Sequence, residues 1–285
     1  MGLAQPLVDG LSVTSVLIIA ALGFAITCGV MNIINMAHGE LVMIGAYTTY
    51  IVTTVSDLPF FIAIIVSFIV SAIIGLIMEK LVIKHLYGRP LETLLATVGI
   101  SIVLQQLVKI TFGTGGKSIS NPISGSMEIG NVVVPYYRLF IIVFAIVLIV
   151  LTVLLMFKTD FGTQLRTVSQ NRQMSEVLGI NTSRIDSLTF AFGSGLAGIA
   201  GAILAPIYTV SPTMGAGYLM DAFMVVVLGG VGSITGTALG SFVVGEADQI
   251  ISTFSTEIVA NIIVFSLIII VIRYKPEGLL KRERR

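Results

Sequence analysis

Tryptophan is absent from the sequence, cysteine occurs once, and charged residues are scarce. Only 11% of the 285 residues are charged and 55% are hydrophobic, which leaves too little polar surface to cover a soluble globule. The single cysteine, Cys28, excludes an intrachain disulfide framework and a cysteine-rich metal site. The first basic residue is Lys80, so the basic region that opens a signal peptide is missing. These shortages indicate a membrane protein, with tyrosine and phenylalanine as its interfacial aromatic residues.

Long apolar runs are what the sequence does contain. A run of about 20 apolar residues matches a hydrocarbon core about 30 Å thick, and each such run predicts a membrane-spanning helix. The runs cover residues 11–31, 33–55, 59–83, 93–113, 137–158, 186–210, 219–232, 234–251 and 256–273. We therefore predict an all-α polytopic membrane protein, with residues 1–285 forming one transmembrane domain.

The number of crossings depends on residues 219–251. The two runs there are short and contain Gly229, Gly230 and Gly232, so they fit either two spans or two half-helices that meet inside the bilayer. Glycine at this density is typical of backbone with positive φ, which makes the three glycines candidates for a gate or its support. The sequence thus predicts seven to nine crossings.

Basic residues gather in three places: after the third run, at Lys84, His85 and Arg89; within residues 158–185; and from Arg273 to the last residue. Because basic loops are retained on the cytoplasmic side, all three should face the cytoplasm. We predict an external N-terminus and an internal C-terminus. The net charge of +1 does not indicate a nucleic-acid partner.

Residues 31–40, MNIINMAHGE, place four polar residues between apolar runs: Asn32, Asn35, His38 and Glu40. An ionisable side chain near the bilayer interior is costly unless it is paired or hydrated, and it is treated as functional by default. The alternative is a helix start, capped by Asn35 and with Glu40 in the positive first turn. Both interpretations stay open, and all four residues are candidates for a gate or its support.

The fourth run carries Thr97, Ser101 and Gln105 four residues apart, which places them on one helix face, with Gln106 beside them. Hydroxyl and amide groups donate and accept hydrogen bonds, as a neutral amide-bearing solute requires. Hydrogen bonding between helices is the alternative. We treat these four residues as candidates for the substrate path. Four acidic residues lie near run ends, where a solvated position explains them most simply: Asp221, Glu246, Asp248 and Glu257.

Two further stretches have a recognisable pattern. Gly193, Ala197, Gly201 and Ala205 recur every fourth residue, which indicates close packing between helices in lipid. Residues 158–185 form a long polar segment in which apolar residues alternate with polar ones. This pattern is typical of a short amphipathic helix that lies on the membrane surface or in a partner's groove.

Several blocks resemble the permease subunits of ABC importers of the branched-chain amino acid and urea group: MNIINMAHGELVMIGAYTTY, RPLETLLATVGISIVLQQ, EVLGINTSRIDSLTFAFGSGLAGIAGAI, LGGVGSITGTALGS and KPEGLL. Together they run from about Asp9 to Leu280. NMAHGELVMIGAYTTY, YGRPLETLLAT and YLMDAFMVVVLGGVG look closer to the urea permease. Val98 stands where urea permeases often carry tryptophan, so a branched-chain amino acid remains the alternative substrate.

The resemblance implies a bacterial inner-membrane complex of two homologous permeases, two cytoplasmic ATPase subunits that bind ATP and Mg, and an extracytoplasmic binding protein. This chain would form the translocation path by alternating access. It would bind no cofactor of its own and would not be an enzyme. Glu176 and Gly179 match the family's coupling motif, which makes residues 158–185 a cytoplasmic coupling loop. The residues we assign to coupling with the ATPase are Arg166, Arg172, Glu176, Leu178 and Gly179.

Three other classes make different predictions. A passive urea or amide channel would conduct when this chain is alone in a liposome. A secondary transporter would respond to an ion gradient without nucleotide. An intramembrane enzyme is disfavoured, because His38, His85 and Cys28 supply no nucleophile and base at a catalytic spacing.

Overall fold

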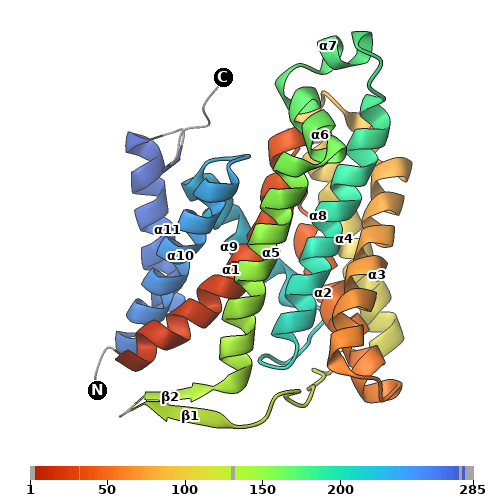
Figure 1. Ribbon diagram of the computed structural model, residues 1–285. Coiled ribbons are helices and arrows are strands. Elements are labelled where there is room, and N and C mark those ends of the chain that lie inside the picture. The colour runs from red at the N-terminus through yellow and green to blue at the C-terminus, as the bar shows by residue number, and fades with distance from the viewer. Residues whose placement is uncertain (1–3, 32, 130–131, 276–277, 280–285) are drawn as a thin grey trace.

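The computed structural model describes residues 4–31, 33–129, 132–275 and 278–279. The described part is a helical bundle with one small hairpin (Figure 1). Its α-helices are α1 (Ala4–Met31), α2 (His38–Tyr50), α3 (Phe60–Leu81), α4 (Pro90–Phe112), α5 (Tyr136–Lys158), α6 (Asp160–Gln170), α7 (Arg172–Val177), α8 (Thr182–Leu204), α9 (Met214–Gly229), α10 (Ile234–Phe254) and α11 (Glu257–Tyr274). A π-helix, η1 (Ile51–Val55), continues α2, and a short 3-10 helix, η2 (Ile83–Leu86), follows α3.

Helices α1 and α8 form the buried centre of the bundle. Helix α8 packs against α1, α2 and α3, and α1 packs in addition against α10. The small residues of α8 allow this: a Cβ atom added at Gly201 would overlap the carbonyl oxygen of Val42 on α2. Helices α3, α4 and α5 present most of their apolar side chains outward, where lipid or a partner covers them. The predicted row of small residues is thus a packing surface, as expected.

The membrane-spanning helices are fewer than predicted. Five helices of the described part are long and apolar enough to cross a membrane, or six if α9 and α10 count as one bent span. This count by length and composition is below the seven to nine predicted, because two of the apolar runs form shorter helices. Helix α2 has 13 residues, which span about 20 Å, and it comes near the thickness of the hydrocarbon core only together with the five residues of η1. The apolar part of α11, Ile258–Tyr274, is also shorter than the other spans.

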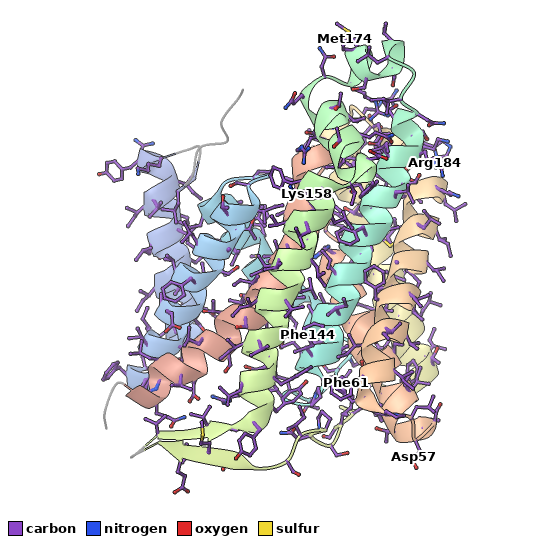
Figure 2. All side chains as sticks on the ribbon, in the orientation of Figure 1. Asp57, Phe61, Phe144, Lys158, Met174 and Arg184 are labelled. Atoms are coloured by element: carbon purple, nitrogen blue, oxygen red, sulfur yellow. The ribbon has the colours of Figure 1, made fainter. Side chains whose placement is uncertain are left out.

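The two ends of the bundle differ in charge and shape. Helices α6 and α7 project from the end at which α11 finishes, and α1 starts at the opposite end (Figure 1). Met174 and Arg184 lie at the first end and Asp57 at the other (Figure 2). As far as the described residues go, the three basic groups therefore lie at one end, as predicted; residues 280–285 lie outside the described residues. That this end faces the cytoplasm stays a prediction from the positive-inside rule.

The opposite end carries an antiparallel hairpin, β1 (Ser126–Ile129) and β2 (Val132–Pro135), in which Met127 pairs with Val134. Gln5 of α1 holds the hairpin through two hydrogen bonds: its amide donates to the Val133 carbonyl at 3.0 Å and accepts from the Val133 N–H at 2.9 Å. Beside them, Arg138 of α5 forms an ion pair with Asp9 of α1. These contacts fix the start of α1 against the start of α5.

Candidate functional site

The polar motif lies where the chain leaves α1 and enters α2. Helix α1 ends at Met31, residues 33–37 are not helical, and α2 begins at His38; Asn32 lies outside the described residues. The Asn35 side chain accepts a hydrogen bond from the Ala37 N–H at 3.0 Å. Asn35 thus turns the chain before α2 but is not its N-cap, which is Ala37, so that part of the helix-start interpretation was wrong. Glu40 does lie in the first turn.

Glu40 brings the two predicted groups of polar residues together. Its side chain is 1% exposed, and its Oε1 accepts hydrogen bonds from Gln105 at 2.7 Å and Ser101 at 3.1 Å. One turn earlier on α4, the Thr97 hydroxyl accepts from the Met36 N–H at 3.1 Å. These bonds offset the cost of burying a carboxylate and attach α4 to the start of α2. Gln106 lies on the exposed side of α4, away from Glu40.

Within the described residues, this cluster retains buried polar atoms without a hydrogen-bond partner: Asn35 Nδ2, His38 Nδ1 and Glu40 Oε2. The other ring nitrogen of His38 lies 3.1 Å from the Ala20 carbonyl oxygen, which orients the ring. Unpaired buried groups are costly, and they are tolerated where water or a polar solute can reach them. We therefore keep the cluster as a candidate gate. The described residues contain no group of ligands suited to a metal ion.

The glycine-rich segment does break the two runs, as one of the two predicted arrangements requires. Helices α9 and α10 are bent by 119° at a short break, as a broken span or a re-entrant loop would be. Gly230 and Gly232, in the break, have φ angles of 101° and 81°, which residues with a side chain rarely adopt. The prediction of positive φ at these glycines is confirmed. The beginning of α9 also reaches the polar cluster, because a Cβ added at Gly215 would lie 2.8 Å from Glu40 Oε2.

The projecting segment of residues 158–185 contains two short helices. The Thr159 side chain caps α6 by accepting from the Gly162 N–H at 3.1 Å, and Asn171 caps α7 by accepting from the Met174 N–H at 3.0 Å. Helix α6 buries Leu165 and Val168 against the bundle, which confirms the predicted amphipathic helix. Gly179 ends α7 with a φ of 83°.

Both predicted arginines of this segment bind their own chain. Arg166 donates to the Met156 carbonyl and stacks over Phe157, with 4.7 Å between the guanidinium carbon and the ring centroid. Arg172 forms an ion pair with the buried Asp186 of α8 at 2.8 Å. Glu176 accepts a hydrogen bond from Thr182 at 2.8 Å. The charged side chains therefore hold α7 in place against α8.

Outward from α7, the exposed surface is apolar. Val177 is 82% exposed, Leu178 67% and Met174 56%, at a point that projects beyond the membrane-spanning helices (Figures 1 and 2). We call these three residues the α7 tip. A groove of about 610 Å³ lies beside it, between α6 and the start of α8. Exposed apolar side chains that neither lipid nor core covers are typical of a contact with another protein.

A polar network that was not predicted lies beneath the α7 tip. Glu79 of α3 is fully buried and accepts hydrogen bonds from Tyr87 and Ser187, each at 2.6 Å. Burial, together with the hydrogen bond to Glu79, raises the pKa of the Tyr87 phenol, so Tyr87 remains a donor. Arg172 stacks over the Tyr87 ring at 5.4 Å. The network therefore links α3, α7 and α8.

We expect Arg172→Met to destabilise the protein by about 3 kcal/mol, because it leaves the Asp186 carboxylate buried without a partner. Thermal unfolding in detergent measures the effect. Arg172→Met with Asp186→Leu should recover most of the loss, since the buried charge is then absent. Arg89→Met is the matched control: Arg89 pairs with Glu92 at the same end, but both are exposed, so about 0.5 kcal/mol or less is expected. Equal effects of the two single substitutions would contradict the assignment.

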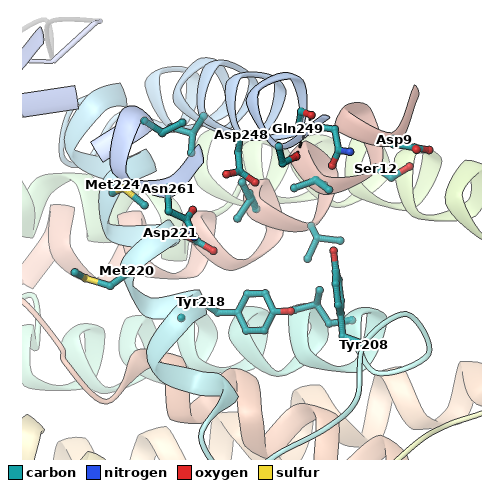
Figure 3. Close-up of a pocket in the computed structure, with 18 of the residues that line it drawn as sticks. Asp9, Ser12, Tyr208, Tyr218, Met220, Asp221, Met224, Asp248, Gln249 and Asn261 are labelled. Carbon is teal, nitrogen blue, oxygen red and sulfur yellow. Dashed lines mark hydrogen bonds between the residues drawn. The ribbon is translucent and has the colours of Figure 1, made fainter. Parts of the chain in front are cut away.

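One of the acidic residues near α9 and α10 differs from the expectation. Glu246 is 8% exposed and packs against Gly10, so its predicted solvated position was wrong. Asp221 and Asp248 line a cavity of about 770 Å³ between α1, α9, α10 and α11 (Figure 3). The cavity was not predicted, because its walls come from distant parts of the chain. One signal existed: Asp221 interrupts the apolar run YLMDAFMVVV. The side chain of Glu257 lies outside the description.

Comparison with known proteins identifies the family. Residues 7–272 match the family model described as branched-chain amino acid transport system / permease component. The chain belongs to this family. It is 31% identical to the high-affinity branched-chain amino acid transport system permease protein BraD of Pseudomonas aeruginosa, over 98% of this chain and 95% of that protein. It is 26% identical to the corresponding LivH protein of Escherichia coli K12, over the same shares of the two chains.

A probable branched-chain amino acid transport permease protein LivH of Methanocaldococcus jannaschii is 26% identical, over 90% of this chain and 85% of that protein. No solved structure matches the chain. Family membership makes this chain a multi-pass permease subunit of the inner membrane and not an enzyme, with ATP hydrolysis on partner ATPases. It also implies ATPase and binding-protein partners in general. The expected closeness to urea permeases has no support in these matches, which favour the branched-chain amino acid alternative.

Proposed function

We propose that this chain is the translocating subunit of an ATP-driven importer of branched-chain amino acids. It pairs with a second, homologous permease in the membrane. Two ATPase subunits contact it from the cytoplasm, and an extracytoplasmic binding protein delivers the amino acid. The description of the matching family and the names of the related permeases support this choice of substrate over urea.

The observation that carries the ATP-driven mechanism is the α7 tip. Helix α7 is held against α8 by Arg172 and Asp186, and its exposed side is apolar. A rigid projection with an apolar end is suited to a groove on a partner protein. Movement of the ATPases would be transmitted from α7 to α8 through this ion pair. It would be transmitted from α8 to α3 through the hydrogen bond between Ser187 and Glu79. Because α8 packs against α1, α2 and α3, displacement of α8 would act on the centre of the bundle.

Within the membrane, we propose that the Glu40 cluster serves as a gate. Glu40 is bonded to Ser101 and Gln105 of α4, and α4 contacts the bundle at α2 and η2. A helix with so few packed neighbours can move at small cost once these hydrogen bonds break. The bend between α9 and α10 reaches the end of α1, because a Cβ added at Gly29 would lie 2.4 Å from Gly232 Cα, and it would support the gate.

We expect the reconstituted complex to accumulate L-leucine, L-isoleucine and L-valine in proteoliposomes only when ATP, both permeases, the ATPases and the loaded binding protein are present. Radiolabelled uptake measures this, and a non-hydrolysable ATP analogue is the control. Accumulation of urea without these amino acids would replace the proposed substrate. Flux through this chain alone would indicate a channel, and uptake driven by an ion gradient without nucleotide would indicate a secondary transporter.

A further inference from the structure

After α11 the chain returns to the bend between α9 and α10. Residues 276–277 lie outside the described part, but Gly278 is described and buried, and its N–H donates to the Lys275 carbonyl at 3.1 Å. The Leu279 N–H donates to the Leu228 carbonyl at 2.7 Å. Leu228 lies in the last turn of α9, whose carbonyls have no donor within the helix. We call Gly278 and Leu279 the strap, because they hold the end of α9 from outside.

The strap meets the bend so closely that there is no room for a side chain. A Cβ atom added at Gly278 would lie 2.6 Å from both N and Cα of Gly230, closer than real Cβ atoms approach other heavy atoms. Gly278 also has a φ angle of 82°, which residues with a side chain rarely adopt. The Leu279 side chain is partly buried and packs against an apolar cluster formed by α1, α9, α10 and α11. The strap is therefore fitted to the bend by its backbone and attached by one side chain.

The bend packs in turn against the end of α1. A Cβ atom added at Gly29 would lie 2.4 Å from the Cα of Gly232. The thiol of the neighbouring Cys28 donates to the Ile33 carbonyl at 3.0 Å, in the segment that leads from α1 to Glu40. The strap, the bend, the end of α1 and the entry to the Glu40 cluster thus form one continuous series of contacts.

Contacts of this kind can separate as a unit. Glycine backbones that touch have no interdigitated side chains, and the strap adds to them one hydrogen bond to α9 and one partly buried side chain. A short segment held by so few interactions opens at a small cost in free energy. Because the segment positions the ends of two helices, its opening is suited to a change between two packed states of the bundle.

We infer that the strap keeps the gate closed in the resting complex by holding the α9–α10 bend against the end of α1. Release of the strap frees the bend to move away from Gly29, which lets residues 33–37 and the Glu40 cluster rearrange. The inference rests on the proposed function of that cluster as a gate and adds the element that controls it.

The native thiol of Cys28 reports on the strap. Cys28 is the only cysteine of the chain, is buried, and precedes the residue of α1 that meets the bend. The assembled complex in nanodiscs, without nucleotide, is treated with a water-soluble maleimide, and mass spectrometry follows the labelling of Cys28. We expect Gly278→Ala to be labelled at least about tenfold faster than the wild type, because the added Cβ displaces the strap and opens the bend locally.

Gly113→Ala is the matched control. Gly113 has nearly the same φ angle, 80°, but an added Cβ would meet no atom within 4 Å, so this variant should be labelled at the wild-type rate. Should Gly278→Ala not fold, Leu279→Pro removes the N–H that binds Leu228, and Leu279→Ala retains it. Leu279→Pro should be labelled faster than Leu279→Ala. Equal rates in Gly278→Ala and Gly113→Ala, or in the two Leu279 variants, would overturn the inference.

Leakage of L-leucine separates control of a gate from a merely structural contact. Proteoliposomes that contain the complex are loaded with radiolabelled L-leucine and diluted without ATP or binding protein. We expect the wild type to retain the amino acid. Gly278→Ala or Leu279→Pro should lose it at least about tenfold faster, with an unchanged elution volume in size-exclusion chromatography.

Retention of L-leucine by these variants would overturn the inference. The proposed function would still stand if the wild-type complex imports L-leucine with ATP. If the wild-type complex imports no branched-chain amino acid with ATP, the proposed function itself fails, and fast labelling of Cys28 in Gly278→Ala would still show that the strap holds the bend.

Discussion

Val177→Asp should reduce ATP-driven uptake by at least about 100-fold, because a carboxylate replaces the most exposed apolar side chain of the α7 tip. A charge that becomes buried in a protein interface without a partner opposes assembly. Val177 makes no contribution to the core, so the variant permease should remain folded. Uptake in proteoliposomes, together with co-purification of the ATPase subunits, measures the two parts of the prediction.

Val177→Thr is the control for this position, because threonine has nearly the shape of valine and no charge. It should keep most of the uptake. The uptake by Glu176→Ala should lie between that of Val177→Asp and that of Val177→Thr. This substitution removes the hydrogen bond from Thr182 and loosens α7, but it leaves the apolar α7 tip in place. Normal uptake and normal ATPase co-purification by Val177→Asp would show that the ATPases contact another surface.

Gly201→Val should abolish the folded permease. Gly201 faces α2, where an added Cβ would overlap the Val42 carbonyl oxygen, and the obstacle is backbone that cannot move aside as a side chain can. Because the substitution would force two buried helices apart, we expect it to lower the free energy of unfolding by about 3 kcal/mol or more, the upper end of the range for overpacked cores. Size-exclusion chromatography of the detergent extract should show aggregated protein, with little of the monodisperse species.

The matched control is Gly99→Val on α4, where an added Cβ would have no atom within 4 Å. This variant should elute like the wild type and keep its thermal midpoint. A monodisperse, stable Gly201→Val protein would mean that α8 and α2 do not approach as closely as the structure shows. The row of small residues in α8 would then have another purpose.

Two groups of polar residues that lie far apart in the sequence prove to be one cluster. Thr97, Ser101 and Gln105 were grouped by their four-residue spacing, and Glu40 by its position between apolar runs. Spacing predicts which residues share a helix face, but it does not predict what that face meets. The hydrogen bonds to Glu40 show that this face of α4 meets the start of α2.

The two arginines Arg166 and Arg172 show the same limit of prediction from sequence. Their position in a polar segment predicted a surface for a partner, because charge in an apolar chain belongs at its aqueous ends. In the structure, Arg166 and Arg172 bind their own chain, and the exposed surface is the apolar α7 tip. An ion pair between Arg172 and Asp186 is not readable from two residues that lie in different helices. That this segment contacts a partner stays a prediction, and of the residues assigned to it Leu178 is the one with an exposed apolar side chain.

What the sequence by itself determined is what depends on composition and short-range spacing. Scarce charge and long apolar runs established a helical membrane protein, and the four-residue row of small side chains established a close helix contact. Clustered glycines indicated backbone with positive φ, but they left two spans or two half-helices open. Tertiary structure alone decided the number of full spans, the partner of Glu40 and the cavity at Asp221 and Asp248. Each of these joins residues from helices distant in sequence, and an apolar run looks the same whether lipid or another helix covers it.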